Sequence, residues 1–143
     1  MTDSQTGNKT ANASTPGPEP KGELAMQTIA MPKDTNANGD IFGGWLVSQM
    51  DLAAGIMSKR VAQGRSATVA IKEVNFLLPV KVGATVSCFA SIIKTGHTSM
   101  QIAVEVWISA FAAHDDLQKA AEGLFVFVAI DDEGKPRALP KPR

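Results

Sequence analysis

The residues best suited to chemistry lie between Asp34 and Asp51, in the stretch DTNANGDIFGGWLVSQMD. Its first half is polar and turn-forming, and Gly43 and Gly44 then precede an apolar segment with helical spacing. The first turn of a helix has backbone N–H groups that lack partners within the helix, and these can bind an anion or a developing oxyanion. Asp51 follows two turns later, among mostly apolar side chains. The sequence therefore predicts a site made of amide donors and one carboxylate.

Asp51 has two interpretations. With Ser48, Gly55 and Ser58 it forms a small, polar stripe at three- and four-residue spacing, which is typical of a solvated helix face. Alternatively, Asp51 is a catalytic carboxylate that faces a cleft. The sequence alone leaves both interpretations open.

The polar loop before the glycines resembles a calcium-binding loop in part of its spacing. Trp45 occupies the twelfth position from Asp34, where a bidentate Glu belongs, so we expect no calcium there. Asn36 is of a type common in turns, and Asp40 of a type common at turns and helix N-termini. Each of the two has this ordinary interpretation beside a functional one.

The histidines and the cysteine favour no further site. His97 and His114 fall in predicted connections with no cysteine or second histidine nearby, so neither a metal site nor a catalytic triad is expected. Cys88 is the one cysteine, which excludes an intrachain disulfide. It lies among alternating apolar residues, which predicts a buried and inert thiol.

Composition excludes several function classes. The formal net charge is zero, so no electrostatic argument favours a nucleic-acid partner. No apolar run approaches the length of a membrane span, and the N-terminus lacks the basic and apolar regions of a signal peptide. We therefore expect a cytoplasmic protein with no membrane partner.

Two regions are expected along the chain. Residues 1–21 are rich in Ser, Thr, Asn, Gly and Pro and contain no aromatic residue, which predicts a disordered tail. Residues 22–143 form a single domain with one helix, Gly44–Ala62, ended by Gly64. Strands are predicted at residues 24–31, 67–78, 86–92, 100–109 and 120–131, with a polar connection at 112–119.

These elements predict an α+β fold with an antiparallel sheet of about five strands. The helix is apolar around most of its circumference, so a strongly curved sheet wrapped around it would supply the cover it needs. A change of phase within the first strand after the helix predicts a β-bulge near Lys72 and Glu73. The last strand is apolar on both faces, which predicts a second buried surface and hence an oligomer.

Four segments together resemble the YciA-like branch of the hotdog-fold acyl-CoA thioesterases. They are DTNANGDIFGGWLVSQMD, VNFLLPVKVGATVSCFA, GHTSMQIAVEVW and VAIDDEGKPRALP, and the similarity extends over about Glu23 to Pro140. The resemblance implies a helix wrapped by an antiparallel sheet. It also implies dimers whose sheets pair edge to edge, commonly assembled as a trimer of dimers. The implied reaction is hydrolysis of acyl-CoA to a free acid and CoA, with neither a metal nor a cofactor beyond the CoA of the substrate.

The resemblance also assigns roles to particular residues. Asp51 matches the helix carboxylate of the family, as general base or nucleophile, and Asn36 matches its loop asparagine. Gly43 and Gly44 match the glycine pair whose amides form the oxyanion hole. Three residues are expected to contact CoA from their position in the family pattern: Arg65, Thr68 and Ser99.

The expected catalytic groups are too far apart to act together within one subunit. Gly44 and Asp51 are seven residues apart, about 10 Å along a helix at 1.5 Å per residue. A site between two subunits would bring the glycine amides of one and the Asp51 of the other to the same thioester. An alternative is a non-catalytic acyl-CoA sensor of the same fold. Hydratases of this fold use a histidine, and neither His97 nor His114 lies near the loop.

Overall fold

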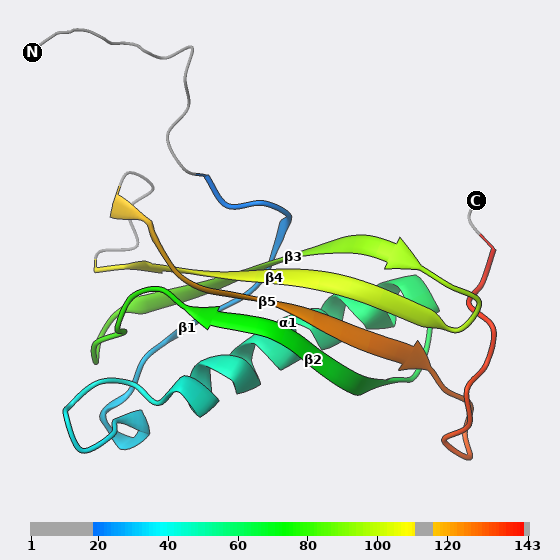
Figure 1. Cartoon of the computed structure of the whole chain (residues 1–143), viewed down its shortest axis with the longest axis horizontal. Helices are drawn as coiled ribbons and strands as arrows, with labels where there is room; N and C mark the ends of the chain where they lie inside the picture. The colour runs from blue at the N-terminus through cyan, green and yellow to red at the C-terminus, as the bar shows by residue number, and fades with distance from the viewer. Residues whose placement is uncertain (1–18, 111–115, 142–143) are drawn as a thin grey trace, which may run out of the picture.

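The computed structural model describes residues 19–110 and 116–141 as one helix packed across a five-stranded antiparallel sheet (Figure 1). The helix is α1 (Gly43–Ala62), and a short 3-10 turn, η1 (Pro32–Asp34), precedes it. The strands are β1 (Glu23–Ile29), β2 (Ser66–Phe76), β3 (Thr85–Thr95), β4 (Ser99–Ser109) and β5 (Gln118–Ala129). The predicted α+β class and curved antiparallel sheet are confirmed.

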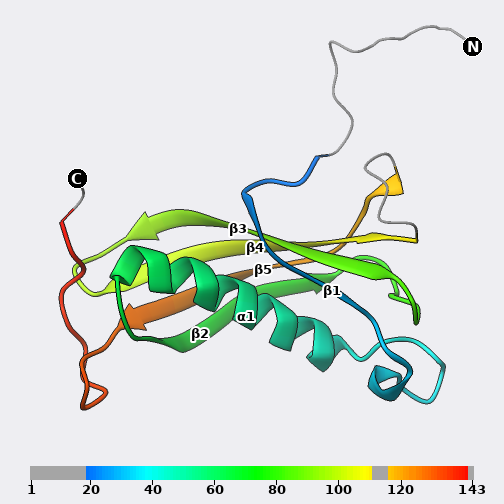
Figure 2. The ribbon, with the colours of Figure 1, turned by 180° about the vertical axis from the view of Figure 1, so that it is seen from behind.

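The strand order β1-β3-β4-β5-β2 places β2 at one edge of the sheet. α1 crosses one face of the sheet, as Figure 2 shows from behind. The core fills the space between them, as the predicted helical and strand periodicities require. Its larger buried side chains include Leu46, Met50 and Met57 from α1, and Met100, Ile102, Val104, Phe125 and Phe127 from β4 and β5.

The outer side of α1 carries exposed apolar side chains. Leu52 and Ile56 are 57% and 43% exposed, although both belong to the apolar part of the helix. The curved five-stranded sheet packs against one side of the helix (Figure 2), which leaves these two side chains exposed. Apolar side chains left exposed on a helix and next to a sheet edge are typical of a surface that another subunit covers.

The predicted bulge in β2 is present. The register between β2 and β5 shifts between Lys72 and Asn75, and Glu73 has a left-handed backbone with φ of 54°. A second shift, between Thr68 and Ala70, was not predicted. These shifts place both Thr68 and Phe76 on the side of β2 that faces α1, since their partners on β5, Phe127 and Ala121, are buried in the core.

The chain ahead of β1 packs on the sheet. Residues 1–18 lie outside the described residues, but Lys21, which the sequence assigned to the tail, donates its backbone N–H to Glu105 at 3.0 Å. Trp107 Nε1 donates to the same carboxylate, and Lys119 forms an ion pair with it. Burial by itself raises the pKa of Glu105, but these partners outweigh it and hold the pKa below its usual range.

The C-terminal end of α1 is closed by side chains that the sequence did not reveal. The helix ends at Ala62 with Gly64 just beyond it as predicted, and Gln63 between them has a left-handed backbone with φ of 51°. Arg137 donates from Nη2 to the carbonyl of Ala62 and from Nε to that of Ile130, both at 2.9 Å. This guanidinium links the segment after β5 to the last turn of the helix.

Three further expectations can be compared with the structure. Cys88 is buried, and burial raises the pKa of its thiol to about 12, so the inert thiol is confirmed. His114 and most of the predicted connection at 112–119 lie outside the described residues, and β5 begins at Gln118. None of the helices in residues 19–110 and 116–141 has the length and apolar character needed to cross a bilayer.

Candidate active site

Asp51 lies where α1 meets the edge strand β2. Its Oδ1 accepts a hydrogen bond of 2.6 Å from the hydroxyl of Thr68, and both side chains are partly buried. A carboxylate held through one oxygen by a hydroxyl keeps its second oxygen available to accept a proton or attack a carbon. Thr68, expected from the resemblance to contact CoA, lies beside this carboxylate, and its contact with CoA stays a prediction.

The polar stripe around Asp51 is not a solvated helix face. Ser58 is fully buried, and its hydroxyl is 2.6 Å from that of Ser66 on β2. Gly55 lies against Phe127, whose ring would be in ordinary van der Waals contact, at 3.8 Å, with a Cβ at that position. Within this stripe, only Ser48 is exposed to solvent. The small side chains thus let the helix approach β2 and β5, and they leave Asp51 at the seam.

Asn36 organises the loop that leads into α1. Its Oδ1 accepts the backbone N–H groups of Asn38 at 2.9 Å and Asp40 at 3.1 Å. Because both partners are donors, the side-chain oxygen must face the loop, which turns the amide NH₂ away from it. The NH₂ group has no partner among the described residues. Asn36 can therefore hold the loop and donate to a bound molecule at the same time.

Gly43 and Gly44 open the helix as predicted, with Phe42 at the N-cap position. No side chain caps this end, and neither glycine N–H has an acceptor among residues 19–110 and 116–141. Gly44 is exposed, and a Cβ there would meet nothing within 4 Å. Free N–H groups at a helix N-terminus favour a negatively charged oxygen.

Asp40 has a structural partner. Its carboxylate forms an ion pair with Lys81, and Ile41 donates its N–H to the carbonyl of Val80 at 2.9 Å. These contacts attach the loop to the segment between β2 and β3. Asp40 therefore acts as a turn carboxylate, and the sequence analysis missed Lys81 because nothing local to either residue indicates the pairing.

Arg65 and Ser99 do not join Asp51 within one chain. Arg65 Nη1 donates to the carbonyls of Asp131 and Asp132, beyond the C-terminal end of α1. Ser99 pairs with Val128 on β5, whereas Thr68 pairs with the neighbouring Phe127, so Ser99 lies on the face of the sheet opposite α1. Their contribution to CoA binding stays a prediction.

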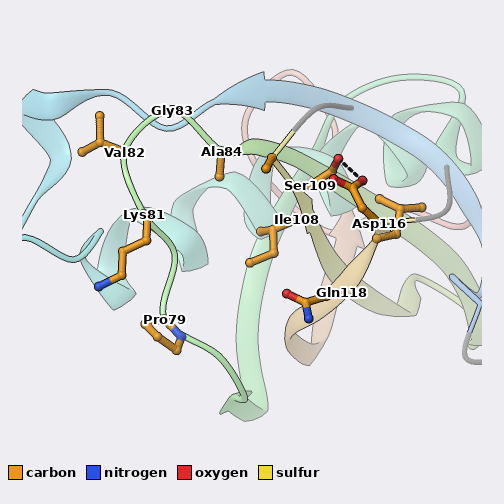
Figure 3. Close-up of a pocket in the computed structure, with 11 residues that line it drawn as sticks. Pro79, Lys81, Val82, Gly83, Ala84, Ile108, Ser109, Asp116 and Gln118 are labelled. Atoms are coloured by element: carbon orange, nitrogen blue, oxygen red, sulfur yellow. Dashed lines mark hydrogen bonds between the residues drawn. The ribbon is translucent and has the colours of Figure 1, made fainter. Parts of the chain in front are cut away.

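A further cavity lies away from these residues. It has a volume of about 750 Å³ and lies between the Pro79–Ala84 segment and the ends of β4 and β5 (Figure 3). Ser109 and Asp116 are hydrogen-bonded to each other in its wall. None of the predicted site residues lines it. The carboxylate and the open amide donors, which acyl and proton transfer require, lie at α1 outside this cavity.

The described residues contain no group of three or more His, Cys, Asp or Glu that could hold a metal ion. The site consists of two clusters within one chain. One holds Asp51 and Thr68, and the other holds the α1 amides and Asn36. They are separated by about 10 Å along the helix axis. A group as small as an ester or thioester carbonyl cannot contact both within one chain.

Residues 38–110 match the Thioesterase superfamily. The acyl-CoA thioester hydrolase YciA of Salmonella typhimurium is 53% identical over 123 residues, which are 85% of this chain and 92% of that protein. A hexameric thioesterase from Yersinia pestis superposes with a TM-score of 0.82 at 52% identity, covering 87% of this chain and 100% of its own. The five-stranded sheet with one helix is the hotdog arrangement that the resemblance implied.

An acyl-CoA hydrolase from Staphylococcus aureus, solved with butyryl-CoA and CoA, superposes with a TM-score of 0.70 at 33% identity, covering 80% of this chain and 67% of that one. Alanine variants of that enzyme replace an asparagine, an aspartate and a threonine. Along its chain these residues are separated by 15 and 17 positions, the same separations as Asn36 to Asp51 and Asp51 to Thr68.

Proposed function

Because this chain belongs to the Thioesterase superfamily, we propose that it hydrolyses acyl-CoA thioesters to a free carboxylic acid and CoA at a site shared between two subunits. One observation supports a shared site: the Asp51–Thr68 pair lies at the sheet edge formed by β2, about 10 Å from the open amides of the same helix. The identity to acyl-CoA thioester hydrolases supports the substrate class. No cofactor takes part beyond the CoA of the substrate.

Pairing of two β2 edges would bring the two clusters together. If two copies pair antiparallel about Ile71, the midpoint of β2, Thr68 of one subunit lies opposite Val74 of the other. In that other subunit, Phe76 lies two residues after Val74, and its ring contacts Gly43. Because Asp51 of the first subunit is hydrogen-bonded to its own Thr68, it approaches the amides of Gly43 and Gly44 of the other subunit. The exposed side chains of Leu52 and Ile56, and the hexameric relatives, support a trimer of such dimers.

The proposed reaction begins with the thioester oxygen accepting the N–H of Gly43 or Gly44, which stabilises the negative charge that develops there. Asp51 of the partner subunit then takes a proton from water as the oxygen of that water attacks the carbonyl carbon, or it attacks the carbon itself to give an anhydride that water cleaves. In both routes the C–S bond breaks and the thiolate of CoA receives a proton. Thr68 positions Asp51, and the NH₂ of Asn36 orients the carbonyl or the water.

Asn36→Asp should separate the two roles of this side chain. The variant keeps oxygens that can accept the N–H groups of Asn38 and Asp40, but it loses the NH₂ donor. We expect kcat/KM to fall on the order of 10²-fold with little change in Tm. Asn38→Ala is the matched control, because the Asn38 side chain has no partner among the described residues. A lower Tm with an equal activity loss in both variants would contradict the donor role.

A panel of acyl-CoAs from acetyl to palmitoyl tests the proposed function. Thiol release by the purified protein should exceed that of a sample lacking it for at least one chain length. Binding of acyl-CoA without any turnover would instead establish the alternative of a non-catalytic sensor. We propose the cytoplasm as the location of the protein, as expected from its sequence.

A further inference from the structure

A small apolar pocket adjoins the open end of α1. It has a volume of about 350 Å³ and lies between the first turn of the helix and the chain that leaves β2. Its deep wall consists of the buried side chains of Ile41, Leu46 and Val80. No charged side chain lines it. Its size and lining are those of a site for an apolar ligand group.

The pocket and the free amides share Gly43. A thioester carbon carries three substituents, namely the oxygen, the sulfur of CoA and the first carbon of the acyl chain. If the oxygen accepts the Gly43 or Gly44 N–H, the first acyl carbon is two bonds from that oxygen and so lies next to the pocket that Gly43 lines. The sulfur leads to a charged, hydrophilic nucleotide, so the acyl chain is the substituent that an uncharged apolar pocket favours.

Phe76 stands at the mouth of this pocket. Its side chain is 53% exposed, although it is large and apolar. A Cβ placed on Gly43 would lie 3.1 Å from the tip of its ring, so the ring and the helix end are in close contact. Leu78, which is 38% exposed, also lines the mouth of the pocket. An exposed apolar rim next to a buried apolar wall favours an apolar ligand that is long enough to contact both.

We propose that this pocket binds the acyl chain of the substrate and that Phe76 at its mouth determines which chain lengths are accepted. The inference rests on the proposed function and adds a residue that sets substrate specificity. Since all the lining residues belong to the subunit that supplies Gly43, the acyl chain is bound by one subunit while Asp51 comes from the other.

The test compares kcat/KM for butyryl-, octanoyl- and palmitoyl-CoA in three variants. Phe76→Ala widens the mouth, and the ratio of kcat/KM for palmitoyl- over butyryl-CoA should rise about tenfold or more. Leu78→Trp narrows it, and the same ratio should fall. Ile93→Ala removes a similarly exposed apolar side chain (59%) from β3, away from the helix end, and should leave the ratio unchanged.

A binding readout separates this inference from the hydrolytic function. In an Asp51→Asn background, calorimetric Kd values for the three acyl-CoAs should show the same change of chain-length preference on Phe76→Ala. If Phe76→Ala does not fold, Leu78→Trp supplies the test alone. Unchanged ratios in the folded variants would overturn the inference even if the protein is an active thioesterase. Failure of the wild type to hydrolyse any acyl-CoA, with a chain-length shift in binding, would overturn the function and keep the pocket.

Discussion

Asp51→Asn should lower kcat by about 10²- to 10⁴-fold, because the amide cannot take a proton or attack a carbon. The substitution keeps the size of the side chain and an oxygen that accepts the Thr68 hydroxyl at the seam between α1 and β2. We therefore expect Tm and oligomeric state to stay close to those of the wild type. Initial rates of thiol release at saturating acyl-CoA measure the loss.

Asp40→Asn is the matched control for this variant. Asp40 is also a carboxylate near the helix entry, but it pairs with Lys81 at the surface. Its loss should weaken the attachment of the loop and reduce kcat less than tenfold, since an exposed ion pair contributes about 1 kcal/mol or less. Equal losses in both variants would move the assignment of the base to Asp40.

The two proposed routes at Asp51 differ in where oxygen from water goes. In single-turnover hydrolysis with H₂¹⁸O, direct attack by water places the label only in the released acid. An anhydride route can also leave the label in the carboxylate of Asp51, where mass spectrometry of the digested protein would find it. Label in Asp51 would assign this residue as the nucleophile, whereas general-base catalysis leaves Asp51 unlabelled in every turnover.

Two inactive variants should restore activity when their subunits mix. Gly44→Pro removes an N–H in the first helical turn, where proline is tolerated and where a Cβ meets nothing within 4 Å. Co-expressed with Asp51→Asn, it forms mixed dimers in which one of the two sites has both an intact amide and an intact carboxylate. Since random pairing makes half the dimers mixed, about a quarter of the wild-type activity should return.

The result expected of a site contained in one subunit is different. In that case every subunit of the mixture lacks one of the two groups, and the activity of the mixture stays between those of the two single variants. Differently tagged subunits, purified through both tags, show whether mixing has occurred. Mixed oligomers without recovered activity would refute the shared site.

Much of the fold follows from local patterns in the sequence. The helix begins one residue from its predicted start and ends at Ala62, because apolar spacing and the glycine pair determine both its face and its entry. The bulge near Glu73 was visible as a change of phase in alternation. Alternation reports which side of a strand is buried, and this is a property of neighbouring residues.

The strand order and the partners of the site residues could not be predicted in this way. That β2 forms the edge, and that Thr68 therefore meets Asp51, depends on its pairing with β5, which lies some fifty residues later in the chain. The pairing of Asp40 with Lys81 and the pocket behind Phe76 depend on the same long-range packing. The amide–carboxylate pattern could be recognised early because both parts belong to one helix.

Arg137 makes the central helix depend on an exposed segment of the surface. The turn around Gly134 is exposed, and a protease that cuts there would detach the guanidinium from the chain that holds it in place. Each carbonyl left without its donor costs about 1–3 kcal/mol, a large part of the roughly 5–15 kcal/mol by which a domain is stable. A single cut far from Asp51 would thus shorten the lifetime of the whole molecule in a cell, and trimming the C-terminal segment would remove a structural part of the domain.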